Sequence, residues 1–348
     1  METIKKALIY DPYLDTLGGG ERYTLTFAKV LVDNGFSVEV AWPYQATINQ
    51  ASERFNLDFS SLQSNELAFH TLTKGNLFSK YLLTKNYDLV FWVSDGSLPL
   101  LFAKKNLVHF QVPFKKVKGA FFKSLFIDKF IYNSRFTQSV LEKSLSKSKG
   151  LVLYPPVDID KFQPSKKENL IVGVGRFDAP LNNKRQDILI EAFKRFHELE
   201  PDYELVLLGG LLGDESKIDH LKAEAQGLPI EFITNPDFKT LQEYYAKAKF
   251  FWHAAGYEID EEKEPEKVEH FGITTVEAIA AGCIPLVIAK GGQKEILVSS
   301  DYLCSNIDEI VTKTINQIKT PQSPSLNLDQ YSQRAFYKNI NTFLESNH

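Results

Sequence analysis

Short apolar runs alternate with amphipathic stretches along nearly the whole of this 348-residue chain. The runs have the length and composition of buried strands, and the stretches between several of them can hold crossover helices, such as Glu21–Asn34. This alternation predicts parallel sheets covered by helices, the α/β class of fold. The strands expected in the first half are Lys6–Tyr10, Ser37–Ala41, Leu89–Val93, Leu107–Phe110 and Phe130–Asn133.

A break at residues 151–158 separates this half from the next. Pro155 and Pro156 cannot continue a central strand or a helix, so the stretch suits a linker. The alternation then resumes, and the expected strands are Leu170–Val174, Leu205–Leu208, Ile230–Ile233, Phe250–His253 and Ile284–Ile288. The helices expected between them are Gln186–Leu199, Ser216–Gln226, Leu241–Ala248 and Thr275–Ala281.

We therefore expect two doubly wound, Rossmann-like domains, residues 1–157 and 158–330, that face a central cleft. A terminal segment, residues 331–348, contains an amphipathic helix that is expected to cross back to the first domain. Ligands of doubly wound sheets bind beyond the carboxyl ends of the strands. Loops that follow strands are therefore the places where functional residues are expected.

Composition excludes several functional classes. The chain has 40 Lys+Arg and 44 Asp+Glu, a net charge of −4, which gives no basic excess for nucleic-acid binding. Its two cysteines, Cys283 and Cys304, lie outside any metal-ligand spacing, and this favours a reducing, cytoplasmic compartment. No apolar run approaches the ~18 residues of a transmembrane helix. The protein is expected to be soluble, or held peripherally at the inner face of a membrane.

A glycine-rich loop, Gly18-Gly19-Gly20, follows the first expected strand and opens a helix. Glycine lets backbone N–H groups approach an anion, and a helix N-terminus favours negative charge, so Gly19 and Gly20 are candidate phosphate ligands. A tight turn that requires a positive φ explains the glycines equally well. The spacing is not the dinucleotide fingerprint, and no P-loop is present, which argues against NAD and ATP sites.

A second candidate loop joins the strand that ends at Val174 to the helix that begins near Gln186. Arg176 and Lys184 lie in this loop, and two such cations suit a diphosphate. The alternative is that Lys184 and Arg185 form a solvated helix start. Cations at a helix N-terminus oppose the helix dipole, so an external anion is expected to compensate them.

The strongest pattern is a pair of carboxylates, Glu269 and Glu277, with a glycine and a helix start between them. Carboxylates only accept hydrogen bonds, so the pair can hold the hydroxyls of a sugar and of a ribose. Backbone N–H groups of Gly272, Ile273 and Thr274 could cap phosphate oxygens. A capping acid and a surface acid would explain either glutamate alone, but not the pair with its glycine.

This Glu-x7-Glu pattern resembles the hallmark of the retaining glycosyltransferases of family four, also called group one, which have the GT-B fold. The stretch from Glu269 to Pro285 is also similar to lipid-linked-oligosaccharide mannosyltransferases of the Glu-His-Phe-Gly type. The resemblance spans nearly the whole chain. Its other parts are the loop 18–22, Gly175–Phe177 with Lys184, the linker 154–158 and Gly291–Ile296.

The resemblance implies a role for each matching residue. Gly19 and Gly20 would meet the donor diphosphate, and Arg176 and Lys184 would neutralise it as it leaves. Glu269 would hold hydroxyls of the donor sugar, and Glu277 would hold the ribose. The residues beside the sugar and the phosphates would be Phe271, Gly272, Ile273 and Thr274.

One histidine also matches the family pattern. His109 ends an expected strand, and the resemblance places it near the reacting sugar as a catalytic residue beside Glu269, Arg176 and Lys184. Without the resemblance, a lone histidine at a strand end is more often structural.

One segment departs from the pattern of the eukaryotic mannosyltransferases. Residues 256–268, hereafter the acidic segment, form an insert-like stretch that separates His253 from Glu269 more widely than in those enzymes.

The chemistry of glycosyl transfer predicts a site without a metal. The reaction builds negative charge on the departing diphosphate, and stabilising that charge is the main task. Arg176 and Lys184 can do so unaided, and no Asp-x-Asp lies in a suitable loop after a strand. We therefore expect no essential metal and no cofactor besides the donor substrate.

A basic region lies between Lys104 and Lys149, where eleven lysines and arginines accompany two acids, a local balance of +9. Phe121, Phe122 and Phe126 are interleaved with its lysines, which suits an interfacial segment on anionic lipid. A surface helix with its phenylalanines in the core is the alternative. The region could also attract an anionic, diphosphate-linked acceptor.

The expected activity is retaining transfer of a sugar, of mannose or glucose type, from a GDP- or UDP-linked donor to a hydroxyl acceptor. The expected product is an α-glycoside on a glycan or a lipid-linked glycan, in polysaccharide or glycolipid biosynthesis. Two alternatives remain open at this point. One is a nucleotide-sugar epimerase of the same fold, and the other is a non-catalytic subunit that binds nucleotide sugars.

Overall fold

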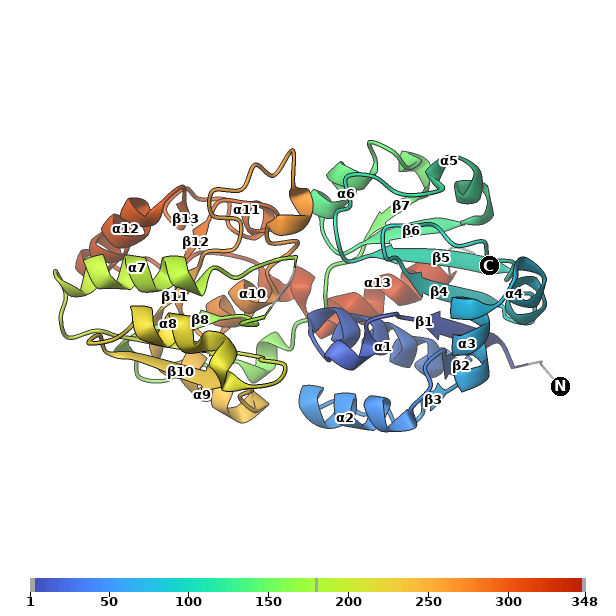
Figure 1. The fold of residues 1–348 in the computed structure, drawn as a ribbon, viewed down its shortest axis with the longest axis horizontal. Helices are drawn as coiled ribbons and strands as arrows, with labels where there is room; N and C mark the ends of the chain where they lie inside the picture. Colours follow the sequence, from blue (N-terminus) through green and yellow to red (C-terminus); the bar gives the residue numbers. More distant parts are fainter. Residues whose placement is uncertain (1–3, 179–180, 346–348) are drawn as a thin grey trace. The chain divides into compact units, whose positions relative to one another are not determined.

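The computed structural model describes residues 4–178 and 181–345, and it consists of two α/β units (Figure 1). The first unit contains the residues up to Pro156 together with those from Gln333 onward, and the second contains Val157–Ser332. Each unit is built on one sheet of parallel strands. The expected α/β class and its two doubly wound sheets are confirmed.

The sheet of the first unit has the strand order β3-β2-β1-β4-β5-β6-β7. The order reverses at β1, whose neighbours are β2 on one side and β4 on the other. Such a reversal is where ligands of open parallel sheets bind. The strands are β1 Lys6–Tyr10, β2 Ser37–Val40, β3 Gln63–Ser64, β4 Leu89–Val93, β5 Lys105–Phe110, β6 Lys129–Tyr132 and β7 Gly150–Val152.

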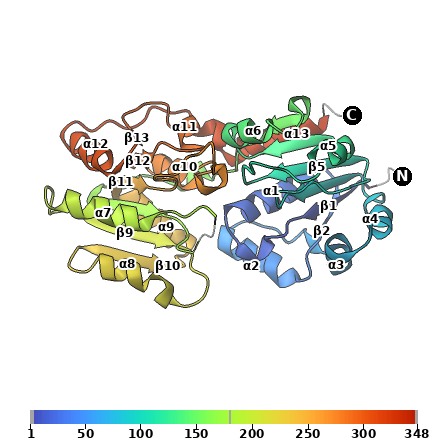
Figure 2. The same cartoon turned by 45° about the horizontal axis from the view of Figure 1, so that its top comes forward.

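Helices cover both faces of this sheet (Figure 2). On one face, Phe27 of α1 stacks on Phe91 of β4 at 4.2 Å, and Phe336 of the C-terminal helix meets Tyr23 at 5.0 Å. The C-terminal helix thus completes the core of the first unit. The helices are α1 Gly19–Asp33, α2 Gln45–Phe55, α3 Glu66–Lys74, α4 Leu77–Thr84, α5 Ala120–Lys123, α6 Arg135–Leu141 and α13 Gln333–Glu345.

The expected linker begins later than the sequence pattern indicates. Leu151 and Val152 belong to β7, which pairs with β6 through Ile131 and Tyr132. They form a strand because the two prolines that end the strand pattern come only at 155 and 156. The part of the linker prediction that covers residues 151–152 is therefore wrong.

The second unit has a sheet of order β10-β9-β8-β11-β12-β13. Trp252 of this sheet is fully buried, meets the rings of Phe193 and Phe196 edge-on, and donates from its indole to Thr314 at 3.1 Å. The strands are β8 Glu168–Val174, β9 Glu204–Gly209, β10 Ile230–Thr234, β11 Ala248–His253, β12 Ile284–Ile288 and β13 Leu303–Cys304. The helices are α7 Gln186–His197, α8 Asp219–Glu224, α9 Phe238–Lys247, α10 Ile273–Ala280, α11 Gln293–Ile296 and α12 Ile307–Lys319.

Within the residues that the structure describes, every helix is too short or too polar to cross a membrane.

Candidate functional site

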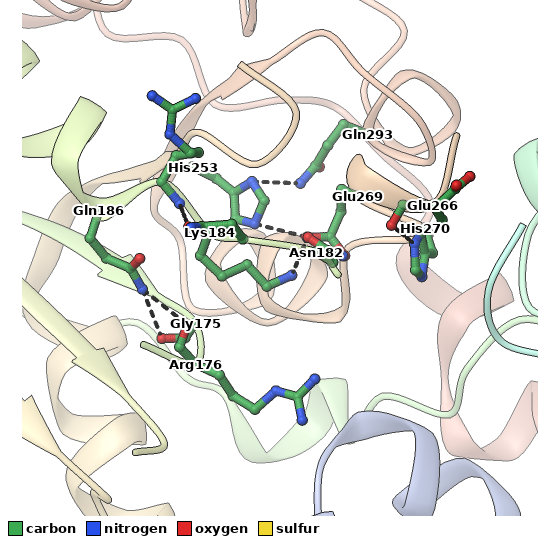
Figure 3. Close-up of polar contacts among 12 residues, drawn as sticks. Gly175, Arg176, Asn182, Lys184, Gln186, His253, Glu266, Glu269, His270 and Gln293 are labelled. Carbon is green, nitrogen blue, oxygen red and sulfur yellow. Dashed lines mark hydrogen bonds and ion pairs between the residues drawn. The ribbon is translucent and has the colours of Figure 1, made fainter. Parts of the chain in front are cut away.

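The candidate site of the second unit lies where three neighbouring strands end. Strands β8, β11 and β12 are parallel and adjacent, so their carboxyl ends share one edge of the sheet. The loops that leave this edge carry Lys184 after β8, Glu269 after β11 and Gln293 after β12. Figure 3 shows these three side chains together with His253, the last residue of β11.

Lys184 and Glu269 form an ion pair in this cluster (Figure 3). Lys184 Nζ lies 2.6 Å from Glu269 Oε2 and 3.3 Å from Asn182 Oδ1. Burial by itself would raise the pKa of Glu269. The Lys184 charge and the contact with His253 outweigh burial, and the pKa lies well below its usual value. Glu269 is therefore an ionised carboxylate at neutral pH.

His253 connects Glu269 to Gln293 (Figure 3). Its Nε2 lies 2.9 Å from Glu269 Oε2, and its Nδ1 lies 3.4 Å from Gln293 Nε2. Burial lowers the pKa of this histidine, so the neutral ring is favoured. Because a carboxylate only accepts hydrogen bonds, the ring proton is on Nε2 and Nδ1 accepts from the Gln293 amide.

The expectation that the cations at the start of α7 require an external anion is wrong. Lys184 pairs with Glu269, and Arg185 pairs with Asp187 at 2.9 Å. Acids within the chain therefore compensate both charges.

Arg176 differs from these two cations. Its side chain is exposed, makes no hydrogen bond or ion pair with residues 4–178 or 181–345, and points away from the Lys184–Glu269 pair in Figure 3. Arg176 is thus a cation of this site that can meet a ligand without losing an internal partner.

Glu277 lies in α10 and is 5% exposed. Tyr245 donates to its Oε2 at 3.4 Å and to the carbonyl of Thr274 at 3.2 Å. Glu277 thus lies in the helix that follows Glu269 in the chain. It has its own partners and does not belong to the Lys184 cluster.

Residues 271–274 form the turn into α10. Gly272 has a φ of +115° and caps the helix, and the N–H groups of Ile273 and Thr274 donate to none of the described residues. These first-turn donors face no internal acceptor, as expected at a helix N-terminus. Phe271 is 3% exposed and packs edge-on against Tyr331 at 5.3 Å.

Gly19, Gly20 and His109 belong to the first unit. The glycines open α1, where Glu21 caps the helix by accepting the Gly18 N–H at 2.6 Å. Neither glycine has a positive φ, so the tight-turn explanation is wrong. A Cβ added to Gly20 would lie 2.1 Å from the side-chain amide oxygen of Gln111, so the Gln111 side chain, whose amide nitrogen donates to the Gly20 carbonyl, would have to move.

His109 is completely buried in β5. Its ring stacks on Tyr23 at 4.1 Å, and its Nδ1 lies 3.1 Å from the Ile131 carbonyl. Burial lowers the pKa of His109 to about 3, so the ring is neutral. Its Nε2 has no partner among the described residues. This is the environment of a structural histidine, and a role near the reacting sugar stays a prediction.

Asp11 is a buried carboxylate that the sequence analysis missed. It follows β1 and accepts from Thr24 Oγ1 at 2.8 Å and from the Tyr13 N–H at 3.0 Å. Burial, with a smaller contribution from Glu21, raises its pKa to about 7. Its position after the first strand and before the glycine loop was the available signal.

No group of three or more His, Cys, Asp or Glu side chains suited to hold a metal ion occurs in the part of the chain that the structure describes. The clustered side chains of the second unit are one lysine, one carboxylate, one imidazole and one amide. Such a set offers hydrogen-bond donors and acceptors and one paired positive and negative charge to a polar ligand.

Two α/β units, each built on a parallel sheet, are the architecture of the GT-B fold. A glycosyltransferase from Rickettsia africae ESF-5 has this fold, with a TM-score of 0.68 and 17% identity over 97% of this chain and 93% of its own. Residues 156–340 match the model of the family described as glycosyl transferases group 1, and this chain belongs to that family.

Relatives of known name are similar over part of their length. A GDP-Man:Man(3)GlcNAc(2)-PP-Dol alpha-1,2-mannosyltransferase from Xenopus laevis is 28% identical over 61% of this chain and 47% of its own. The protein of the same name from Homo sapiens is 31% identical over 41% of this chain and 30% of its own. The chain thus spans about half or less of the length of these relatives.

Proposed function

We propose that this chain is a retaining glycosyltransferase that moves a hexose from a nucleotide diphosphate sugar to a hydroxyl of a glycan or lipid-linked glycan. The donor we favour is GDP-mannose, because the relatives described above are named for it. The product would be an α-glycoside. The observation that supports this proposal most is the buried Lys184–Glu269–His253 cluster inside the region that matches the family.

The proposed step exchanges one bond at the sugar for another. The bond from the anomeric carbon to the diphosphate oxygen breaks, and a bond from that carbon to the acceptor oxygen forms on the same face. The acceptor proton passes to the departing diphosphate. The groups that matter most are those that stabilise negative charge on the leaving group as it develops.

The second unit supplies the proposed donor site. Glu269 accepts hydrogen bonds from sugar hydroxyls, and its low pKa keeps it ionised for this purpose. Glu277 accepts from the ribose. Arg176, the exposed cation, meets the diphosphate, and the N–H groups of Ile273 and Thr274 add donors at a helix N-terminus. Phe271 and Gly272 shape the turn that presents these donors.

Lys184 has a double role in this proposal. In the structure it neutralises Glu269, and a bound diphosphate offers it a second, competing anion. A flexible ammonium group with three donors can contact both.

For the first unit we propose two roles. The N-terminus of α1, where Gly19 and Gly20 lie, binds phosphate oxygens, and His109 accepts from a sugar hydroxyl through Nε2. Its neutral ring with the proton on Nδ1 suits an acceptor, not an acid.

We further propose that the first unit binds an anionic membrane surface from the cytoplasmic side. Phe121 and Leu125 are 96% and 73% exposed, which excludes the alternative with these side chains in the core. A chain of ring contacts at 5.2–5.8 Å connects residues 121–126 to α4, and it runs from Phe122 through Phe126 and Phe102 to Tyr81. Exposed Leu77 and Phe78 of α4 extend the apolar face. The part of this face that Phe121, Phe122, Leu125 and Phe126 form lies within the region of charge +9, and such a combination complements anionic lipid.

Transfer is favoured over the two alternatives by the family match and by the names of the relatives. An epimerase would release an altered nucleotide sugar without an acceptor. A non-catalytic subunit would bind the donor and leave it intact.

A thermal-shift experiment with a panel of nucleotide sugars tests the proposed donor site. A ligand that binds only the folded protein raises its melting temperature, so GDP-mannose should raise it more than UDP-linked sugars do. Turnover in the presence of a chelator tests the metal-free mechanism. Loss of activity on chelation, with recovery on addition of a divalent metal, would contradict it.

A further inference from the structure

The acidic segment, residues 256–268, contains six acids and two lysines. Its two ends lie close together in the structure. Gly256 has a φ of +85°, and a Cβ added to it would lie about 3 Å from the Val268 side chain, so the two ends of the segment pack together. Val268 itself is fully buried. The segment is thus anchored to the second unit beside Glu269, the next residue of the chain.

One contact joins the segment to the loop of Lys184. The Tyr257 carbonyl accepts from Arg185 Nη1 at 3.2 Å, and the Arg185 guanidinium lies over the Tyr257 ring at 5.6 Å. Arg185 directly follows Lys184 and has a φ of +52°. The segment therefore contacts the side chain of the residue next to the lysine of the site.

A second contact joins the segment to the loop after β12. Glu261 Oε2 accepts the Gly291 N–H at 2.7 Å, and its Oε1 pairs with Lys294. The neighbouring Gly292 N–H donates to the Glu269 carbonyl at 2.8 Å. A Cβ on Gly291 would lie 2.0 Å from that carbonyl oxygen, so the turn that Glu261 holds rests directly on the backbone of Glu269.

The same turn also leads to the side chains of the cluster. Gln293 follows it at the start of α11, and its amide contacts the ring of His253, which contacts Glu269. Glu261 thus reaches Glu269 by two routes, one through the backbone of the turn and one through Gln293 and His253.

We propose that Glu261 is a positioning residue for the donor sugar. It fixes the Gly291–Gly292 turn and thereby the Glu269 carboxylate, while Tyr257 fixes the loop of Lys184 through Arg185. This inference rests on the proposed function, because it assumes that Glu269 holds the donor sugar. The other ion pairs of the segment, such as Glu264 with Lys267, stay within it.

Calorimetry tests the proposal by measuring the affinity of the Glu261→Ala and Glu264→Ala variants for the nucleotide sugar and for the nucleoside diphosphate. Both changes remove one acid and one ion pair from the same segment, so they are matched in charge. Glu261→Ala should lower the affinity for the nucleotide sugar by about tenfold, since a small misplacement of a binding group has effects of that order or larger. Its affinity for the nucleoside diphosphate should stay within about twofold of wild type, because Glu277, not Glu269, holds the ribose. Glu264→Ala should leave both affinities unchanged.

Two more variants separate positioning from general destabilisation. Glu261→Gln keeps an oxygen for the Gly291 N–H and should restore most of the affinity for the nucleotide sugar, even if Glu261→Ala folds poorly. Lys294→Ala removes only the ion pair and should remain close to wild type. Equal binding of the nucleotide sugar by Glu261→Ala and Glu264→Ala, or equal losses for sugar-bearing and sugar-free nucleotides, would overturn the proposal. Failure of the wild-type protein to bind any nucleotide sugar would instead overturn the proposed function.

Discussion

Lys184 and Glu269 lie 85 residues apart in sequence, and their charged atoms meet at 2.6 Å with side chains that are 18% and 10% exposed. A buried charge that loses its partner costs about 3–5 kcal/mol of stability. The pair is therefore expected to stabilise the fold in addition to its proposed role in donor binding.

The first prediction is that Lys184→Met destabilises the protein by about 3 kcal/mol, because it leaves the Glu269 carboxylate buried without its cation. Glu269→Gln in the same chain should recover most of that loss by removing the buried charge. Urea unfolding of the two single variants and the double variant measures the interaction. Additive losses in the double variant would show that the two charges do not stabilise each other.

The second prediction concerns Arg176. If this exposed cation meets the departing diphosphate, Arg176→Ala should reduce turnover by about 10²-fold, comparable to the loss of one oxyanion donor. Stability should be unchanged, because the guanidinium has no partner among the described residues. Lys184→Ala should also reduce turnover by about 10²-fold, and the double variant should lose less than the product of both effects. Turnover of Arg176→Ala near the wild-type value would refute the role of this arginine.

The third prediction concerns Glu277. Removing a carboxylate that accepts from ribose hydroxyls costs about 1.5–3 kcal/mol of binding, so Glu277→Ala should weaken nucleoside diphosphates by roughly 10- to 100-fold. Tyr245→Phe is the control, because it removes the neighbouring hydroxyl and leaves the carboxylate in place. Calorimetry gives both affinities. An unchanged affinity in Glu277→Ala would remove this residue from the donor site.

The fourth prediction is a pH dependence set by Asp11. Its folded pKa of about 7 lies above the ordinary carboxyl value, so the folded state binds the proton more tightly than the unfolded state does. The stability that this proton contributes is present at low pH and is lost as pH rises from about 4 to about 7. The Asp11→Asn side chain cannot ionise, so the variant should not lose this stability as pH rises.

Melting temperatures between pH 4.5 and 8.5 test this dependence. The melting temperature of Asp11→Asn minus that of wild type should increase with pH up to about 7 and then level off. Asp58→Asn is the control, since that carboxyl is fully exposed and the pKa of Asp58 is lowered by Ser60. A difference between Asp11→Asn and wild type that does not change with pH would show that Asp11 is ionised throughout.

The fifth prediction concerns the membrane. Each lysine near an anionic surface contributes roughly 1 kcal/mol, and this attraction weakens as salt is added. Serine at Lys115, Lys116, Lys118 and Lys123 should therefore release the protein from anionic vesicles, while turnover of a soluble acceptor analogue survives. A matched variant with serine at Phe121 and Phe122 should lose binding without loss of charge. Wild-type protein that never floats with anionic vesicles at low salt would rule out this surface as a membrane site.

Much of the fold could be predicted because buried parallel strands are short, continuous apolar runs. The bounds of Lys6–Tyr10, Leu89–Val93 and Ile284–Ile288 match β1, β4 and β12. Two-residue strands such as β3 are set by pairing with a neighbour and leave no pattern of their own. Helix α12 was missed although Asn306 caps it and Ile307, Ile310 and Val311 repeat at helical spacing.

The candidate site could be predicted only in part. Glu269 and Glu277 stand out because their spacing is local in the sequence. The partners of Glu269 come from other loops, so the ion pair with Lys184 and the contact with His253 depend on the order of strands in the sheet. His253 could have been found as a polar residue at the end of the expected apolar strand Phe250–His253.

Product analysis with the wild-type protein tests the central claim most directly. The protein would be incubated with GDP-mannose and a lipid-linked glycan that ends in mannose, and the products would be examined by NMR, with Glu269→Gln as the control. The account predicts release of GDP together with a new α-linked mannose on the acceptor, and almost none of either with the variant. A β-linked product, an altered nucleotide sugar formed without the acceptor, or an intact donor would contradict it.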